Sequence, residues 1–130
     1  MRTSFKPANY NSLSPYLILD DAERFIDLMK AIFDAQLLRR YDHEDGTIMH
    51  AELMLDDSVI MFSSSSTAYQ ATTTILHLYV PDVYESFTKA IEMGCESIEA
   101  PVIKKGDPDT RGTFRDFAGN LWSVSTQANT

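Results

Sequence analysis

The chain of 130 residues contains one cysteine, few glycines and few basic side chains. The single cysteine, Cys95, excludes an internal disulfide and a zinc site built from several thiolates. Only 11 Lys and Arg stand against 19 Asp and Glu, and the net charge of -8 disfavours nucleic-acid binding, which needs clustered basic residues. No run approaches the roughly 18 apolar residues of a membrane helix, and no export signal is recognisable. We therefore expect a soluble, cytoplasmic protein that binds neither nucleic acid nor a membrane.

Hydrophobic residues make up 44% of the chain, enough to form the core of one domain spanning residues 1–130. The stretch LSPYLILDD at 13–21 alternates, with Leu17 and Leu19 on one face and Tyr16 on the other, which predicts a half-buried strand. Apolar residues then recur at helical spacing behind Asp21, a good N-cap: Phe25, Ile26, Met29 and Phe33. The pattern predicts a strand followed by a helix of about three turns.

The second half of the sequence repeats this plan. ILHLYV begins at residue 75, Asp82 precedes a second helix, and Gly94 ends it, whereas the first helix would end at Asp34, which also tolerates positive φ. Three strand-like runs follow each helix. Asp21 matches Asp82 at an offset of 61 residues, and the run starting at Asp57 matches the run starting at 119 at an offset of 62. These offsets predict two βαβββ modules, about 12–63 and 75–126, joined by a polar segment at 63–74.

These paired modules resemble the vicinal oxygen chelate superfamily, which includes glyoxalase I, extradiol dioxygenases and the bleomycin resistance proteins. The segments SPYLILDDAERFIDLMKAIFDA, GTIMHAELML, LYVPDV and RDFAGNLWSVST look like its PhnB-like branch. The resemblance implies an α+β fold in which the modules form a curved eight-stranded mixed sheet around a cup, with helices on the convex face. It also implies a homodimer, because the bleomycin resistance proteins complete their sites across two subunits.

Metal-dependent members of this superfamily take one ligand from the first and last strands of each module. Strand register places these positions at Ser14, Met61, Ile75 and Ser123. None of the four is a good ligand for a divalent metal, so we expect no metal centre of the usual kind and no cofactor. His77 lies two residues beyond Ile75 on the same face, and this keeps a non-standard metal site with His50 and Glu52 open.

Alternation along the strands assigns side chains to the cup. In GTIMHAELML, Met49, Ala51 and Leu53 belong to the core and His50 and Glu52 to the cup, while Trp122 belongs to the core. Carrying this strand to the second module at an offset of 62 places Phe114 in the cup. The predicted ligand-binding residues are Tyr16, His50, Glu52, Met61, His77, Tyr79, Phe114 and Ser123. Aromatic and apolar walls with a few polar groups are typical of a small-molecule pocket, which the segments 63–74 and 104–112 could border.

Structural roles for the polar residues stay open beside the functional ones. His50 could simply be hydrogen-bonded to Glu52, and Glu52 could form an ion pair with an arginine: Arg39, Arg40 or Arg115. The leading hypothesis is a metal-independent protein of the glyoxalase/bleomycin resistance type that binds a small cationic or aromatic molecule, for resistance or sequestration. The alternative is a lyase, isomerase or dioxygenase-type enzyme that uses a non-standard metal site or His50 and Glu52 as an acid–base pair. A third is an interaction domain whose cup is filled by its own side chains.

Overall fold

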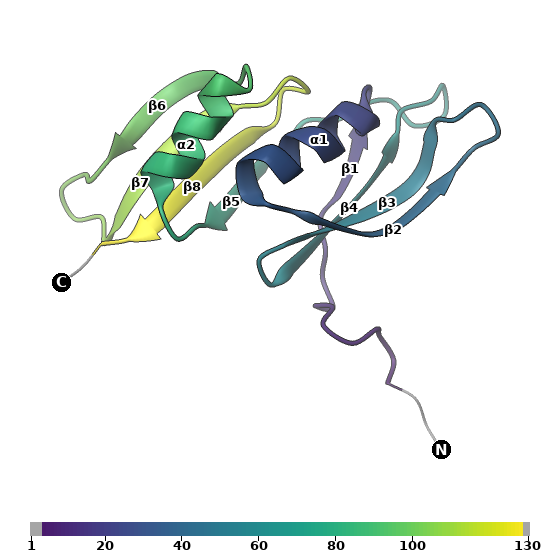
Figure 1. Cartoon of the computed structure of the whole chain (residues 1–130), viewed down its shortest axis with the longest axis horizontal. Helices are drawn as coiled ribbons and strands as arrows, with labels where there is room; N and C mark the ends of the chain where they lie inside the picture. Colours follow the sequence, from purple (N-terminus) through teal and green to yellow (C-terminus); the bar gives the residue numbers. More distant parts are fainter. Residues whose placement is uncertain (1–3, 129–130) are drawn as a thin grey trace. The chain divides into compact units, whose positions relative to one another are not determined.

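A computed structural model describes residues 4–128, and its element order confirms two βαβββ modules in an α+β fold (Figure 1). The first module contains β1 (Tyr16–Leu19), α1 (Ala22–Phe33), β2 (Gln36–Asp42), β3 (Ile48–Leu55) and β4 (Ser58–Ser64). The second contains β5 (Ile75–Tyr79), α2 (Val83–Glu92), β6 (Glu96–Val102), β7 (Asp109–Arg115) and β8 (Leu121–Gln127). Over these residues, no helix is long and apolar enough to cross a membrane.

Each module forms a four-stranded mixed sheet with the same topology. The strand order is β1-β4-β3-β2 in the first and β5-β8-β7-β6 in the second. In each sheet the first strand runs parallel to the last strand of its module, and the other neighbours are antiparallel. The chain divides into two compact units. The first comprises the described residues up to Ile26 with Asp34–Thr72, and the second comprises Asp27–Phe33 with the described residues from Thr73 onward.

The helices begin and end where the sequence predicts. The backbone N–H of Arg24 donates to the Asp21 carboxylate at 3.2 Å, and Asp82 accepts bonds from the first turn of α2 in the same way. These bonds satisfy N–H groups that the first turn of a helix leaves without a partner. After the helices, Asp34 has a φ of 55° and Gly94 a φ of 97°, the left-handed conformation expected at both positions.

The core of the first unit lies on the face of its sheet that carries Leu17, Leu19 and Phe62, all buried. Phe25 of α1 packs edge-on against Phe62 with ring centroids 5.1 Å apart. The first part of α1, which belongs to this unit, therefore packs on this face, and the alternating residues of β1 and β4 point to the opposite one.

Met49 was expected in this core, and that expectation is wrong because β3 contains a bulge. His50 pairs with Tyr41 and Ile48 with Asp42, which leaves Met49 as an extra residue between two pairs. Ile48 is 1% exposed and takes the core position, whereas Met49 is 49% exposed. A bulge shifts the alternation by one residue, and here it turns Met49 to the face opposite the core.

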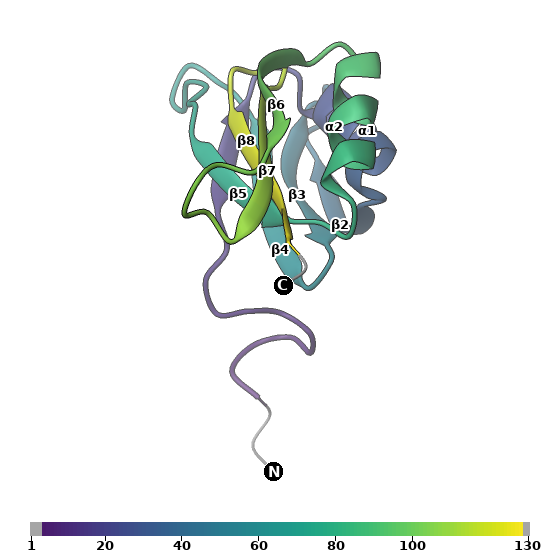
Figure 2. The ribbon, with the colours of Figure 1, turned by 90° about the vertical axis from the view of Figure 1, so that its left-hand side faces the viewer.

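The second unit buries an aromatic cluster between its sheet and α2, which lies along one face of that sheet (Figure 2). Phe114 is fully buried, with ring centroids 6.4 Å from both Trp122 and Phe87 of α2. Phe33 adds a ring 5.2 Å from Trp122. Trp122 is in the core as expected. The prediction that Phe114 faces a ligand is wrong, since the ring is one of the largest side chains of the core.

The lengths of two hairpins explain this error. Leu55 pairs with Ser58 across the two-residue turn between β3 and β4. Between β7 and β8, Asp116 N–H donates to Asn120 O at 3.0 Å across three residues, 117–119. The extra residue means that the offset of 62, valid for β4 and β8, is 61 for β3 and β7. A slip of one residue moves every side chain of a strand to the other face of its sheet.

Candidate functional site

Four of the predicted residues meet on the face of the first sheet opposite its core. Tyr16 of β1 pairs with Met61 of β4, and Met61 in turn pairs with Glu52 of β3. Partners in adjacent strands point to the same face, so the three side chains form a row across the sheet. His50 lies two residues before Glu52 on β3, which places it on the same face.

Three of these side chains form a continuous hydrogen-bonded series. The Tyr16 hydroxyl lies 3.0 Å from Nδ1 of His50, and Nε2 of His50 lies 2.7 Å from the Glu52 carboxylate. The rings of Tyr16 and His50 stack with centroids 5.6 Å apart. The structural role considered for His50, a hydrogen bond to Glu52, is therefore present, and the same bond couples the carboxylate to Tyr16.

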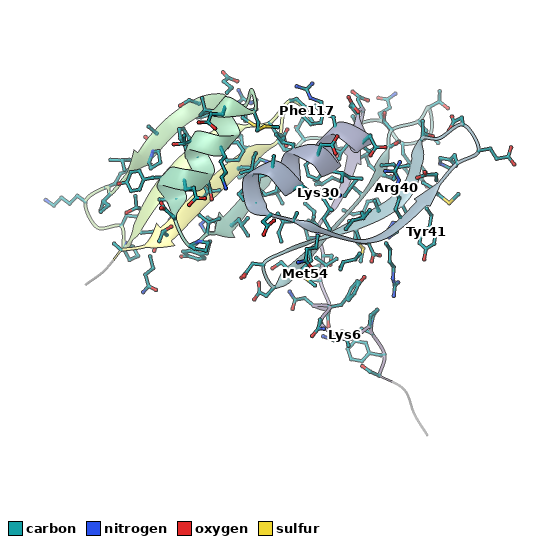
Figure 3. The ribbon with its side chains drawn as sticks, viewed as in Figure 1. Lys6, Lys30, Arg40, Tyr41, Met54 and Phe117 are labelled. Carbon is teal, nitrogen blue, oxygen red and sulfur yellow. The ribbon has the colours of Figure 1, made fainter. Side chains whose placement is uncertain are left out.

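The ring of Tyr41 also contacts His50. Its ring centroid lies 6.4 Å from that of His50 at an interplanar angle of 23°. Arg40 and Tyr41 extend to opposite sides of β2 (Figure 3), and Arg40 binds Glu23 of α1 through two bonds of 2.7 and 2.9 Å. The imidazole thus contacts the rings of both Tyr16 and Tyr41, which restricts its orientation.

Glu52 is nearly inaccessible, with a side chain that is 5% exposed, and it has further partners. The Tyr10 hydroxyl donates to Oε1, and Arg39 Nε lies 3.8 Å from the same atom, which confirms one of the three ion pairs considered. Burial alone would raise the pKa of Glu52. Hydrogen bonds from Tyr10 and His50, with the charges of His50 and Arg39, outweigh burial and lower this pKa below its usual value. The carboxylate is therefore ionised at neutral pH.

Tyr10 comes from the segment that precedes β1, and nothing in the sequence marked it. Lys6 Nζ donates to the carbonyl of Tyr10 at 2.7 Å, and the Arg39 guanidinium lies 5.5 Å from the centre of the Tyr10 ring. Lys6 lies on the part of this segment that extends away from the strands of the first sheet (Figure 3). The hydrogen bond to Glu52, followed by burial, raises the pKa of the Tyr10 phenol. Tyr10 is therefore a neutral donor that helps to fix the Glu52 carboxylate.

An open pocket of about 830 Å³ adjoins Tyr16 within the first unit. It lies between the strand face that carries Tyr16, the turn between β2 and β3, and the segment after β4. Its lining consists of Tyr16, Ile18, His43, Asp45, Thr47, Met49, Ser63, Ser64, Ser65, Ser66, Ala68 and Tyr69. The expectation that residues of the polar segment 63–74 border a pocket is confirmed, and Met49 reaches this pocket because of the bulge in β3.

The pocket combines aromatic and thioether surface with one carboxylate. Tyr16, Met49 and Tyr69 supply rings and sulfur, which contact flat ligands favourably. Thr47 donates its hydroxyl to Asp45 at 2.6 Å and its backbone N–H at 2.9 Å, and these two bonds lower the pKa of Asp45. The lining contains no Lys or Arg, so its one fixed charge is negative. This surface suits a small, partly aromatic molecule with a positive charge or hydrogen-bond donors.

Of the residues that the sequence did not identify, Tyr69 carried a signal. It is the one aromatic residue in the otherwise polar segment 63–74, and an aromatic side chain in a polar connection is typical of a binding loop. Asp45 lies in an acidic cluster with Asp42 and Glu44, a composition typical of a solvated turn. Its Asp-Gly-Thr sequence does form a turn, but the turn stands at the rim of the pocket.

The remaining predicted residues form a polar group in the second unit. His77 pairs with Ser123 and Tyr79 with Ser125, so the four share one face of β5 and β8. The Tyr79 hydroxyl donates to the buried Asp109 at 2.7 Å, and His77 Nε2 lies 3.2 Å from Ser125 Oγ. Burial, followed by the charge of Arg111, lowers the pKa of His77. The site residues therefore occur as two groups, each within one unit.

The chemistry of the expected metal positions does not fit a metal centre. Ser14, Met61, Ile75 and Ser123 offer two hydroxyls, one thioether and an alkyl group, and Ser123 already accepts a bond from Arg111 at 3.3 Å. Within residues 4–128, no three His, Cys, Asp or Glu side chains are grouped so that they could hold a metal ion. We therefore derive no chemical step through a metal.

The repeated βαβββ modules and their sequence motifs define the class of protein to which the chain belongs. Residues 11–124 match the Glyoxalase/Bleomycin resistance protein/Dioxygenase superfamily, and the chain belongs to it. This membership confirms the resemblance drawn from the sequence. Members of the superfamily bind small-molecule ligands and commonly form dimers.

Among individual proteins, the chain is similar to the uncharacterized protein Mb0911c of Mycobacterium bovis, with 31% identity over 124 residues covering 87% of this chain and 81% of that protein. Among solved structures it is similar to TioX from Micromonospora sp. ML1, with a TM-score of 0.75, 24% identity, and coverage of 91% of this chain and 99% of that one. The PhnB protein from Bacillus cereus has a TM-score of 0.65 at 14% identity, with 89% and 99% covered. At these identities, the two structures establish the fold alone.

Proposed function

We propose that the protein is a metal-independent binding protein of the glyoxalase/bleomycin resistance type that holds a small, partly aromatic, cationic molecule in the pocket of its first unit. The observation that carries this proposal is the lining of that pocket: Tyr16, Met49 and Tyr69 around the ionised Asp45. Sequestration of a toxic compound is the role that the superfamily suggests. A homodimer is the assembly expected from the resemblance.

The physical basis is that different residues of the pocket contact different parts of such a ligand. A planar ring can stack on a tyrosine or contact the methionine sulfur, contributing on the order of 1 kcal/mol per favourable contact. A cation gains from tyrosine faces and from the carboxylate of Asp45. The volume of about 830 Å³ lies within the range of ordinary ligand sites.

Thermal denaturation with a panel of aromatic compounds, including N-methylquinolinium and its uncharged parent quinoline, tests this function. A ligand that binds the native state raises the melting temperature, by the equivalent of about 2.7 kcal/mol at a hundred times its Kd. We expect the cation to raise it more than quinoline does. Tyr69→Ala should weaken the response to both compounds, and Asp45→Asn the response to the cation alone.

Tyr84→Ala is the matched control, because Tyr84 is an exposed tyrosine on α2 in the second unit. Its response to both compounds should equal that of the native chain. A panel in which no compound raises the melting temperature would contradict the proposal and favour an interaction domain whose cup is filled by its own side chains.

A specific observation supports one alternative, metal-free acid–base catalysis. The Glu52 carboxylate orients His50 at 2.7 Å, and His50 contacts Tyr16 beside the pocket, as a general base and its orienting group would. In that case His50→Ala would abolish turnover while ligand binding persists. Loss of binding and turnover together would instead assign His50 to the binding surface.

A further inference from the structure

The hydrogen-bonded series that ends at Tyr16 has a defined direction. An ionised carboxylate can only accept hydrogen bonds, so His50 Nε2, 2.7 Å from Glu52, must carry a hydrogen. When the imidazole is neutral, its one N–H group is on Nε2 and Nδ1 is an acceptor. The Tyr16 hydroxyl, 3.0 Å from Nδ1, must then be the donor in that contact.

This direction determines what Tyr16 offers to the pocket. A phenol has one hydrogen to donate, and in Tyr16 it is committed to His50. Only the lone pairs of the hydroxyl oxygen remain for a ligand. Tyr16 is 48% exposed and lines the pocket, so a ligand can reach this residue.

We propose that Tyr16 is a specificity-determining residue that selects ligands bearing an N–H or O–H donor, of the aromatic amine or amidinium class, and that Glu52 sets this preference through His50. The inference rests on the proposed function, since it concerns the ligand of the same pocket. Glu52 acts here as a positioning residue, because it fixes the hydrogen of an imidazole that lies between it and Tyr16.

Asp45 adds a second hydrogen-bond acceptor to the pocket. Asp45 is ionised and accepts hydrogen bonds only. The Ser65 hydroxyl donates to Asp20 at 2.7 Å, so its hydrogen is also committed, whereas the Ser64 hydroxyl accepts from the Ile48 N–H at 2.9 Å and keeps its own hydrogen. Tyr16 and Asp45 therefore both offer hydrogen-bond acceptors to a ligand in the same pocket.

The groups around Glu52 and His50 favour the hydrogen-bond direction that runs from Tyr16 through His50 to Glu52. The Tyr10 hydroxyl donates to Oε1 of Glu52, and Arg39 Nε lies 3.8 Å from the same oxygen, which leaves Oε2 for His50. Tyr41 stacks on the imidazole from β2, and Met61, the neighbour from β4, carries no titratable group. No second acceptor competes for Nε2 in the contacts described.

Glu52→Gln should reverse the direction with almost no change in shape. The donors Tyr10 and Arg39 would hold the amide oxygen at the position of Oε1, and the NH₂ group would then face His50. His50 Nε2 becomes the acceptor, Nδ1 carries the hydrogen and donates to Tyr16, and the Tyr16 O–H is no longer committed to His50. The same tyrosine then prefers a ligand that accepts a hydrogen bond.

Two measurements test this inference at about pH 8, where free imidazole is neutral. The first is the ¹⁵N NMR spectrum of the imidazoles, with His50→Gln used to assign the signals. The second is the affinity for 6-aminoquinoline, which carries a donor, and 6-methoxyquinoline, which has the same ring and only accepts. We expect the Nε2–H tautomer in the native chain and about fivefold tighter binding of the amine. In Glu52→Gln we expect the Nδ1–H tautomer and a preference that is reversed.

Tyr16→Phe keeps the ring and removes the hydroxyl, so it should bind both quinolines equally, and Tyr84→Phe should behave as the native chain does. Equal binding of both quinolines to the native chain, or an unchanged preference in Tyr16→Phe, would overturn the role of Tyr16 and leave the proposed function standing. Failure of both quinolines to bind a native chain that N-methylquinolinium still stabilises would overturn the inference alone, whereas failure of all three compounds would overturn the proposed function and the inference with it. An Nδ1–H tautomer in the native chain would overturn the inference alone.

Discussion

At the scale of single residues, Glu52 shows how a buried charge is compensated. Its carboxylate receives hydrogen bonds from Tyr10 and His50 and lies 3.8 Å from Arg39, so each oxygen has a partner. An unpaired carboxylate at this position would cost several kcal/mol. The sequence indicated the pair of His50 and Glu52 and one of its arginine partners. It did not indicate Tyr10, because a residue brought in by an irregular segment leaves no periodic pattern.

The lowered pKa of Glu52 predicts a dependence of stability on pH. A carboxyl group whose pKa is lower in the folded state than in the unfolded state stabilises the fold above its unfolded pKa of about 4.5. This stabilisation is lost as the pH falls from about 4.5 through the folded value. We expect urea unfolding at a series of pH values to show a decrease over that interval that is smaller in Glu52→Gln.

Glu92→Gln supplies the comparison for this measurement, because Glu92 is an exposed carboxylate at the end of α2. Other carboxylates also lose stabilising contacts in acid, Asp107 among them, so the quantity to compare is the difference between each variant and the native chain. Parallel curves for the native chain and Glu52→Gln would show that the contacts of Glu52 do not persist in solution.

At the scale of elements, the two modules differ mainly in their last hairpin. The hairpin between β7 and β8 has three residues, 117–119, between the paired Asp116 and Asn120, and the last of them, Gly119, has a φ of 91°. Asp116 organises it by accepting bonds from the N–H groups of Ala118 and Asn120, at 2.9 and 3.0 Å, and from the Trp122 indole at 2.9 Å. This is the three-residue hairpin in which the final residue takes a left-handed conformation.

Gly119→Ala should therefore destabilise the chain for two separable reasons. The backbone at this position would hold the alanine at a positive φ, which costs about 1 kcal/mol. The added methyl group would also lie 3.0 Å from Cγ2 of Thr73. Gly46→Ala controls for the first reason, because Gly46 has a φ of 89° with nothing within 4 Å of the added atom. We expect urea unfolding to show a loss in Gly119→Ala that exceeds the loss in Gly46→Ala by about 1 kcal/mol. Equal losses would mean that Thr73 moves aside freely.

The sequence predicted the elements of the fold correctly but not the face of every side chain. The strands, helices, caps and repeat follow from local periodicity and from Asp21, Asp82 and Gly94, so these were predicted correctly. Two errors, at Met49 and Phe114, arise from a bulge and from a loop that is one residue longer. An insertion of one residue changes no composition or periodicity within a strand, yet it reverses every face assignment beyond it.

At the scale of the whole molecule, the fold and its chemistry are separate properties. The superfamily gathers many activities on one repeated βαβββ plan, so membership establishes the architecture and leaves the reaction to the side chains. In this chain those side chains form two polar groups, one around His50 and Glu52 and one around Tyr79 and Asp109. The pocket with a defined lining lies beside the first group, which is why the binding proposal is placed there.

Removal of metal provides the test at this scale. The positions that carry ligands in metal-dependent relatives hold Ser14, Met61, Ile75 and Ser123, which cannot neutralise or coordinate a divalent cation as carboxylates and imidazoles do. We expect elemental analysis of protein purified without chelators to find far less than one divalent metal ion per chain. We also expect EDTA to leave unchanged the rise in melting temperature that N-methylquinolinium produces. A stoichiometric metal, or a response to ligand that EDTA abolishes and Zn²⁺ or Mn²⁺ restores, would require donors other than these four and would refute metal-independent binding.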